Sequence, residues 1–276
     1  MRLVIFLDDI LIMNQTKEGA LKDGERAVNL LESLGFLINF KKSNLVPSQV
    51  LEYLGFKIDS SIMTLSLPLE KTKKIRTICQ EVFSSNPVSV RKLSEVIGNL
   101  TASIQAVYPA PLHYRHLQMA KNQIFSQYQD YNAQVLLTLE AQRDLLWWIH
   151  HLNDTNGKSI VMNQPSVVIQ TDASNLGWGA TCKNVRIGGA WLQSEIHYHI
   201  NVLELLPITH AVKAFLKQET NMVVLIQTDN KTAMTCINKM GGTVSKVCNQ
   251  LALDLWEWCL KKSISMRAGK ENVIAD

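Results

Sequence analysis

The chain contains 276 residues, of which 46% are hydrophobic and 19% are charged, and its formal net charge at pH 7 is +4. This length suits two or three compact units, and the composition excludes a disordered or collagen-like chain. The mild basic excess allows a polyanionic partner without requiring one. The five cysteines have no C-x-x-C spacing, which favours buried thiols in a reducing, intracellular compartment.

Residues 2–13 predict two short strands that meet at a turn, because two β-rich apolar runs flank Asp8 and Asp9. The stretch is too short for a membrane span and has no signal-peptide cleavage site, so we expect no membrane partner. Apolar residues at helical spacing predict a helix over residues 20–34. Two more short strands are expected over residues 36–46 and 50–58.

The middle of the chain turns helical from about residue 69. Three helices are expected over residues 68–83, 89–104 and 137–152, and Ser89 is a candidate N-terminal cap for the second. Residues 153–166 are rich in turn-forming side chains and form the best domain boundary in the chain.

Beyond this boundary the pattern changes to three strands, a helix, a strand, two helices and a strand. This order predicts an α/β layer fold with a mixed sheet. The expected elements cover residues 166–172, 177–184, 187–192, 200–217, 222–229, 230–240, 244–261 and 263–268.

The tetrapeptide IQTD ends two of these apolar strands, at Asp172 and at Asp229. Side chains alternate along a strand, so each aspartate faces the same way as the glutamine two residues before it. If the two strands are neighbours, both carboxylates lie at one end of the sheet and repel each other unless a cation separates them. Oxygen-only ligands favour Mg²⁺ or Mn²⁺.

Structural roles remain open for each acid taken singly. Asp229 could cap the helix that follows it, and Asp172 could stabilise a turn. Glu204 lies among apolar residues of its helix and needs a partner if it points inward, although a solvent-facing position is the alternative. His197 and His199 are spaced as metal ligands on a strand, but without a third ligand they make a weak site.

Four motifs in order, "TDASNLGWGA", "HINVLELLPI", "TDNKTA" and "GKENVIAD", resemble the ribonuclease H domain of retroelement reverse transcriptases. The residues of these motifs are most similar to those of the DIRS-like, tyrosine-recombinase elements. The resemblance implies an acid set of Asp172, Glu204, Asp229 and Asp276, which would hold two Mg²⁺ or Mn²⁺ ions and hydrolyse the RNA strand of an RNA–DNA hybrid. Met266 and Ala268 replace a histidine and a proline that are common in relatives, which puts local substrate contacts in doubt.

The first half resembles the reverse transcriptase palm and thumb. "FLDD" matches the aromatic-x-Asp-Asp motif, which implies a metal role for Asp8 and Asp9, although an ordinary acidic turn is the alternative. "LGFLINFKKS" resembles the lysine-bearing strand that follows, and "LEYLGFKI" resembles the primer-contacting hairpin. The basic run "KTKKIR" is either a phosphate-binding or a solvated helix face. The resemblance implies nucleic-acid contacts from Lys41, Tyr53, Gly55, Lys71, Lys73, Lys74, Arg76, Ser174 and Asn230.

The expected organisation is the C-terminal part of a palm over residues 1–65, a helical thumb over 66–118, a connection and linker over 119–165, and a ribonuclease H-like domain over 166–276 that is truncated at its last helix. The upstream palm aspartate and the fingers are not in this sequence, so we expect a polyprotein fragment that hydrolyses hybrid but does not polymerise DNA. Asp276 should be a poorly ordered ligand, because its helix has no following residues. A catalytically inactive hybrid-binding remnant is the alternative; nothing supports a domesticated structural protein.

Overall fold

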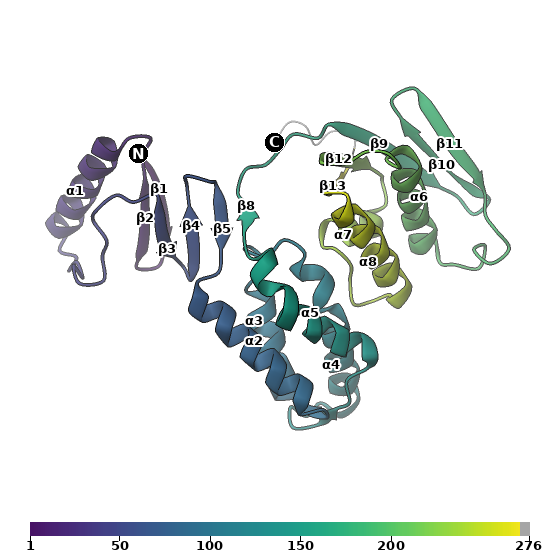
Figure 1. Ribbon diagram of the computed structural model, residues 1–276, viewed down its shortest axis with the longest axis horizontal. Helices are drawn as coiled ribbons and strands as arrows, with labels where there is room; N and C mark the ends of the chain where they lie inside the picture. Colours follow the sequence, from purple (N-terminus) through teal and green to yellow (C-terminus); the bar gives the residue numbers. More distant parts are fainter. Residues whose placement is uncertain (271–276) are drawn as a thin grey trace.

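The structure is a computed structural model that describes residues 1–270. The chain forms three successive units, and the helical one lies between the other two (Figure 1). We refer to residues 1–66 as the N-terminal unit, residues 67–157 as the helical unit and residues 166–270 as the C-terminal unit. Among the described residues, no helix is long and apolar enough to cross a membrane.

The N-terminal unit is rich in strands but has no core of its own. Strands β1 and β2 form an antiparallel hairpin, helix α1 follows, and β3, β4 and β5 form a sheet that β8 extends. Within residues 1–66, all of which are described, no hydrophobic side chain is buried. The bounds are β1 Arg2–Phe6, β2 Asp9–Met13, α1 Lys17–Ser33, β3 Val50–Tyr53, β4 Phe56–Asp59, β5 Thr64–Ser66 and β8 Lys158–Ser159.

Two strand predictions in this unit need correction. Residues 36–46 form turns and loop rather than a strand, because their backbone hydrogen bonds are local, such as those from Lys42 N and Ser43 N to Asn39 O. Their apolar side chains have nothing to pack against, and Leu37 is 100% exposed. Residues 50–58, predicted as one strand, instead form the β3–β4 hairpin, whose turn uses Gly55 at a φ of +74°.

The helical unit is organised around a buried apolar cluster to which all four of its α-helices contribute. Helix α2 packs along α5 through side chains of one face, including Ile75 and Val82. Ser89 caps α3 as predicted, accepting a bond from Lys92 N. The bounds are α2 Leu69–Ser84, α3 Val90–Thr101, the 3-10 helix η1 Ala110–His113, α4 Arg115–Tyr128 and α5 Leu139–Thr155, with β6 Val88–Ser89 paired to β7 Gln134–Val135.

Helix α4 was not predicted from the sequence. Leu117 and Ala120 of this helix are buried, and Ile124 and Phe125 are partly buried against the same cluster, so its apolar stripe is short and set among polar residues. The other three helices of the unit were predicted with small errors at their ends.

The C-terminal unit is a five-stranded mixed sheet with helices, in the order of elements that the sequence predicts. The strand order is β11-β10-β9-β12-β13; β9 to β11 are antiparallel, and β12 is parallel to both β9 and β13. The predicted α/β class with a mixed sheet is therefore confirmed. The bounds are β9 Val167–Ala173, β10 Gly177–Cys182, β11 Val185–Ala190, α6 Ile200–Phe215, β12 Met222–Gln227, α7 Lys231–Asn238, α8 Lys246–Lys261 and β13 Ile264–Gly269.

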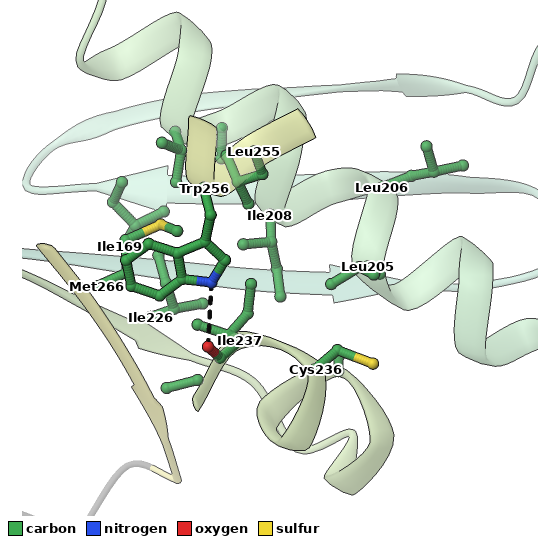
Figure 2. Packing of buried hydrophobic residues seen from close by; sticks show 14 of the residues in the cluster. Ile169, Leu205, Leu206, Ile208, Ile226, Cys236, Ile237, Leu255, Trp256 and Met266 are labelled. Carbon is green, nitrogen blue, oxygen red and sulfur yellow. Dashed lines mark hydrogen bonds between the residues drawn. The ribbon is translucent and has the colours of Figure 1, made fainter. Parts of the chain in front are cut away.

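The core of this unit lies where the sheet meets α6 and α8. Ile169 and Ile226 project from neighbouring strands towards these helices, and Leu255 and Trp256 of α8 pack in the same buried cluster (Figure 2). The Trp256 Nε1–H donates to Ile237 O over 3.1 Å, which satisfies the only polar atom of the buried indole (Figure 2). This packed layer gives the ends of β9 and β12 a rigid base.

Candidate metal centre

The two IQTD tetrapeptides lie side by side in the sheet. Strands β9 and β12 are parallel neighbours, and the register pairs Ile169 with Ile226 and Gln170 with Gln227. The two aspartates that end these tetrapeptides therefore come from adjacent strands, at the same end of the sheet. The tetrapeptide therefore occurs twice because two neighbouring strands each place an aspartate at the same end of the sheet, not because a domain is duplicated.

Side-chain alternation separates the core face of this sheet from its polar face. Ile169 and Thr171 of β9 are buried against the helices, whereas Gln170 and Asp172 are exposed. On the polar face the Gln170 Nε2–H donates to Gln227 Oε1 over 2.8 Å, and the Thr181 hydroxyl donates to Gln170 Oε1 over 3.1 Å. A hydrogen-bonded polar row thus runs across three strands beside the aspartates.

Helix α6 brings a third carboxylate to the same place. It packs against β9, and one carboxylate oxygen from each of Asp172, Glu204 and Asp229 lies within 4.8 Å of the other two. The aspartates are exposed, whereas Glu204 is only 7% exposed. Among the described residues this is the only group of three or more acidic, histidine or cysteine side chains that close.

The environment of Glu204 fits a divalent cation. Its Oε2 atom is buried and has no hydrogen-bond partner. Burial, together with the charges of the neighbouring Asp172 and Asp229, raises the pKa of Glu204 to about 7. A buried, unpaired carboxylate that faces two others is costly unless a cation joins them, and an oxygen-only donor set suits Mg²⁺ or Mn²⁺.

The capping role considered for Asp229 belongs to its neighbour. Asn230 is the N-cap of α7, and its side chain accepts a bond from Ala233 N over 2.9 Å. The Asn230 Nδ2–H also donates to Asn201 Oδ1 on α6 over 3.4 Å, which joins the two helix starts beside the acids. Asp172 does make a short-range contact, since its Oδ1 accepts from Ala173 N.

The histidine pair does not form a metal site among the described residues. His199 caps α6, with Nδ1 accepting from Asn201 N over 3.2 Å, and His197 is exposed in the preceding loop. Sequence reasoning assigned no role to the glycines beside Asp172. An open depression of about 510 Å³ there is lined by Asp172, Ser174, Trp178 and four glycines of β10 and β11. An added Cβ at Gly188 would clash with the Trp178 carbonyl oxygen, so this position excludes a side chain.

The acids of the N-terminal unit are not clustered in this way. Asp8 lies in the β1–β2 turn and Asp9 opens β2, and both are exposed. The Tyr53 hydroxyl donates to Asp9 O and Val4 O over 3.2 and 3.4 Å, which ties the β3–β4 hairpin to this one. Within residues 1–270 no further acid joins Asp8 and Asp9 in a group of three.

The basic side chains of "KTKKIR" have separate environments. The Lys71 Nζ lies 4.6 Å from the centre of the Phe56 ring and donates to Gly55 O over 3.4 Å. Lys73 pairs with Glu70 at 3.0 Å. The Arg76 Nε–H donates to Ile149 O over 3.1 Å and so ties α2 to α5, whereas Lys74 is exposed.

Two other sequence-based candidates lie away from these groups. Lys41 lies in the turn that replaces the expected strand. Ser174 follows β9, where its hydroxyl contacts Gly177 O and accepts from Leu176 N. Asp276 lies outside the described residues.

The chain is similar to parts of viral polyproteins. It is 23% identical over 292 residues to the genome polyprotein of Petunia vein clearing virus, covering 99% of this chain and 12% of that protein. It is 22% identical over 290 residues to the enzymatic polyprotein of Cauliflower mosaic virus, covering 99% of this chain and 40% of that protein. The chain thus spans less than half of these relatives. No protein-family model matches it.

Solved structures give a weaker likeness. The foamy viral protease-reverse transcriptase in complex with double-stranded DNA has a TM-score of 0.49 at 19% identity, covering 98% of this chain and 55% of that one. The same protein in complex with an RNA/DNA hybrid also has a TM-score of 0.49, at 16% identity, covering 98% and 36%. The relatives reported are viral, so they do not bear on the resemblance to DIRS-like elements.

Proposed function

We propose that the chain is a reverse transcriptase–ribonuclease H region of a retroelement polyprotein, and that its C-terminal unit hydrolyses the RNA strand of an RNA–DNA hybrid. The observation that carries this proposal is the meeting of Asp172, Glu204 and Asp229 at the end of two parallel strands. The similarity to viral polyproteins along 99% of the chain supports it. The rest of such a polyprotein and a primer–template duplex are the further partners proposed.

The three acids, together with Asp276, are the proposed ligands of two Mg²⁺ or Mn²⁺ ions. When bound, such a pair activates a water molecule and stabilises the leaving oxygen of an in-line displacement at phosphorus. A duplex would approach from the side of the exposed aspartates, and the buried Glu204 would hold the ions from the side of the protein interior. Because Glu204 is protonated at low pH, loss of its proton is a condition for metal binding.

The face around the acids favours close approach of a sugar–phosphate backbone. Gly179 and Gly188 are paired across β10 and β11 next to Asp172, and neither has a side chain that would keep a strand away. Ser174 and Asn230 flank the acids and are proposed to contact the duplex through hydroxyl and amide groups. The polar row of Gln170, Thr181 and Gln227 continues this surface.

The N-terminal unit is proposed to belong to the polymerase of a longer parent. Asp8 and Asp9 would each offer a carboxylate to metal there, and Lys41, Tyr53, Gly55 and the four basic residues of "KTKKIR" would contact nucleic acid. The palm, thumb, connection and ribonuclease boundaries stated above remain proposals, as does the DIRS-like subtype, which rests on the wording of "GWGA" and "HINVLEL" alone.

The proposal is tested with the full chain, a labelled RNA–DNA hybrid and either Mg²⁺ or Mn²⁺. Wild-type protein is expected to cut the RNA strand, and Asp172→Asn and Asp229→Asn are expected to bind hybrid without cutting it. Asp154→Asn, which removes one exposed carboxylate from α5, is the matched control and is expected to retain activity. Wild-type protein that binds hybrid but cuts nothing with either metal would instead establish the inactive remnant.

A further inference from the structure

The helical unit contacts the C-terminal unit through a hydrogen bond, a ring contact and a buried leucine. The Arg115 Nη2–H donates to Lys239 O over 2.9 Å, and the rings of Tyr108 and Trp256 meet edge to face at 6.2 Å. Leu112 of η1 packs into the core of the C-terminal unit rather than that of its own. The start of α4 and the chain around α8 therefore hold the two units together.

His116 is the residue of this contact that touches both units through its ring. Its backbone N–H donates to Asp144 Oδ2 over 3.0 Å, and its Nδ1 lies 3.2 Å from Asp144 Oδ1 on α5. Its Nε2 lies 3.4 Å from Asn249 Nδ2 on α8. One ring nitrogen thus belongs to the helical unit and the other faces the C-terminal unit.

The orientation of the Asn249 amide is fixed by its second contact. Asn249 Oδ1 accepts the Gly242 backbone N–H over 3.2 Å, which leaves Nδ2 to face His116. Asn249 is buried, and Gly241, at a φ of +104°, has no side chain that would displace the amide. The amide therefore presents a donor to the imidazole and cannot turn without losing the Gly242 bond.

A donor on Asn249 requires an acceptor on His116. In the neutral ring Nδ1–H donates to Asp144 and the lone pair of Nε2 accepts from Asn249, so both contacts are satisfied. In the protonated ring Nε2 also carries a hydrogen, and two N–H groups face each other across 3.4 Å. Uptake of one proton from solvent therefore converts this contact from an attraction into a repulsion.

We propose that His116 is a proton-operated latch, which closes the helical unit on the C-terminal unit when neutral and releases it when protonated at Nε2. The latch does not depend on the proposed hydrolysis, because none of its groups touches Asp172, Glu204 or Asp229. The imidazole is 16% exposed, so solvent protons reach it without unfolding of the chain.

The charged and titratable groups that face the imidazole come from two elements. Asp144 and Glu140 lie on α5, and His113 lies on η1. The neighbouring Arg115 of α4 is engaged elsewhere, because its guanidinium donates to Gln118 Oε1 and Lys239 O. The hydrogen bond to Asp144 raises the pKa of His116, while burial opposes this, so the proton is taken up no lower than in an ordinary histidine. Burial lowers the pKa of His113 to about 3, so that ring remains neutral and is not the switch.

The first test is hydrogen exchange of the full chain over residues 239–250, measured at about pH 8 and about pH 5 and corrected for the intrinsic rate. The segment is expected to exchange about tenfold faster at the lower pH, as the loss of one buried hydrogen bond implies. The radius of gyration should rise over the same pH range. His116→Asn keeps a donor for Asp144 but has nothing at the Nε2 position, so it should exchange quickly at both pH values.

Asn249→Asp is the decisive variant, because it should invert the response. A carboxylate can accept from both Gly242 N and the protonated imidazole, so this variant should be closed at the lower pH and looser at the higher one. Asn153→Asp on the exposed side of α5 is the matched control and should behave as wild type. Circular dichroism at both pH values checks that each variant is folded.

Three results would each overturn the latch. Wild-type exchange that is the same at both pH values is one, and an unchanged pH response in His116→Asn is the second. The third is a folded Asn249→Asp protein that responds with the same sign as wild type. Each of these leaves the metal centre untouched, so failure of the latch is distinguishable from failure of the proposed hydrolysis.

Discussion

Two pairs of aspartates lie at the ends or turns of strands in this chain, and they differ in what lies beneath them. Asp8 and Asp9 lie on a hairpin in a unit where no hydrophobic side chain is buried. Asp172 and Asp229 end two paired strands that are backed by α6 and a packed core, and α6 supplies Glu204. Among the described residues, acids on strands therefore gather into a candidate metal centre where another packed element adds a third carboxylate.

The difference between the two pairs is tested most directly by removing carboxylates from each. Asp172→Asn is expected to abolish cleavage of the RNA strand, because the remaining acids cannot hold two ions. Asp8→Asn combined with Asp9→Asn is expected to leave the cleavage rate unchanged. The measurement is single-turnover cleavage of a labelled hybrid at saturating Mg²⁺. Equal losses in the two variants would show that the N-terminal acids belong to the same reaction.

The difference in packing between the two units is measured by making the same substitution, leucine to alanine, in each. Leu255→Ala in α8 empties a site that is 0% exposed and is expected to destabilise the chain by about 2–5 kcal/mol. Leu37→Ala, at a side chain that is 100% exposed, is expected to change stability by less than about 0.5 kcal/mol. Urea unfolding followed by tryptophan fluorescence measures both, and a large effect of Leu37→Ala would reveal packing that residues 1–66 do not display.

Glu204 should make the stability of the metal-free chain depend on pH. Its pKa is raised from 4.5 to about 7 in the folded chain, so between these values the folded chain holds a proton that the unfolded chain has released. Stability therefore falls as the pH rises through this window, by about 2 kcal/mol after allowance for solvent screening.

Chelator-treated protein, unfolded with urea at pH values across the window, measures this fall. Glu204→Gln is neutral at every pH and should be the more stable protein at high pH. Excess Mg²⁺ should reverse the slope in wild type alone, because metal binding requires the charged form of Glu204. A wild-type slope that survives Glu204→Gln would assign the titration to another group.

Local patterns predicted much of this arrangement, and tertiary contacts account for the rest. Alternation along the two IQTD strands gave the polar face of Asp172 and Asp229, because a strand's side-chain period is fixed by its backbone. The strand expected over residues 36–46 failed for the opposite reason, since an apolar run becomes a strand only with a partner. The contact of His116 with Asn249, 133 residues away, has no local signal at all.

The orphaned oxygen of Glu204 likewise depends on how α6 packs on β9, which the sequence of the helix alone does not fix. Helix α4 was missed because its apolar positions, Leu117, Ala120, Ile124 and Phe125, form a short stripe set among polar residues.

The smallest expected effect concerns the start of α2, at the junction between the N-terminal unit and the helical unit. Of the four cations proposed to contact phosphate, Lys74 is exposed, whereas Lys73 pairs with Glu70 and Arg76 bonds to Ile149 O. Each phosphate contact contributes about 0.9 to the slope of log affinity against log salt. Lys74→Ala is therefore expected to lower that slope by about one on a hybrid, with no change in stability.

Arg76→Ala supplies the contrast within the same helix. It removes the bond between α2 and α5 and is expected to cost about 1 kcal/mol of stability. Because its guanidinium is partly engaged by the protein, the salt slope should change by less than it does in Lys74→Ala. Fluorescence anisotropy at several salt concentrations, alongside urea unfolding, separates these effects. If neither substitution alters the slope, the basic run is a solvated helix face, and duplex binding rests on the polar face of the C-terminal sheet.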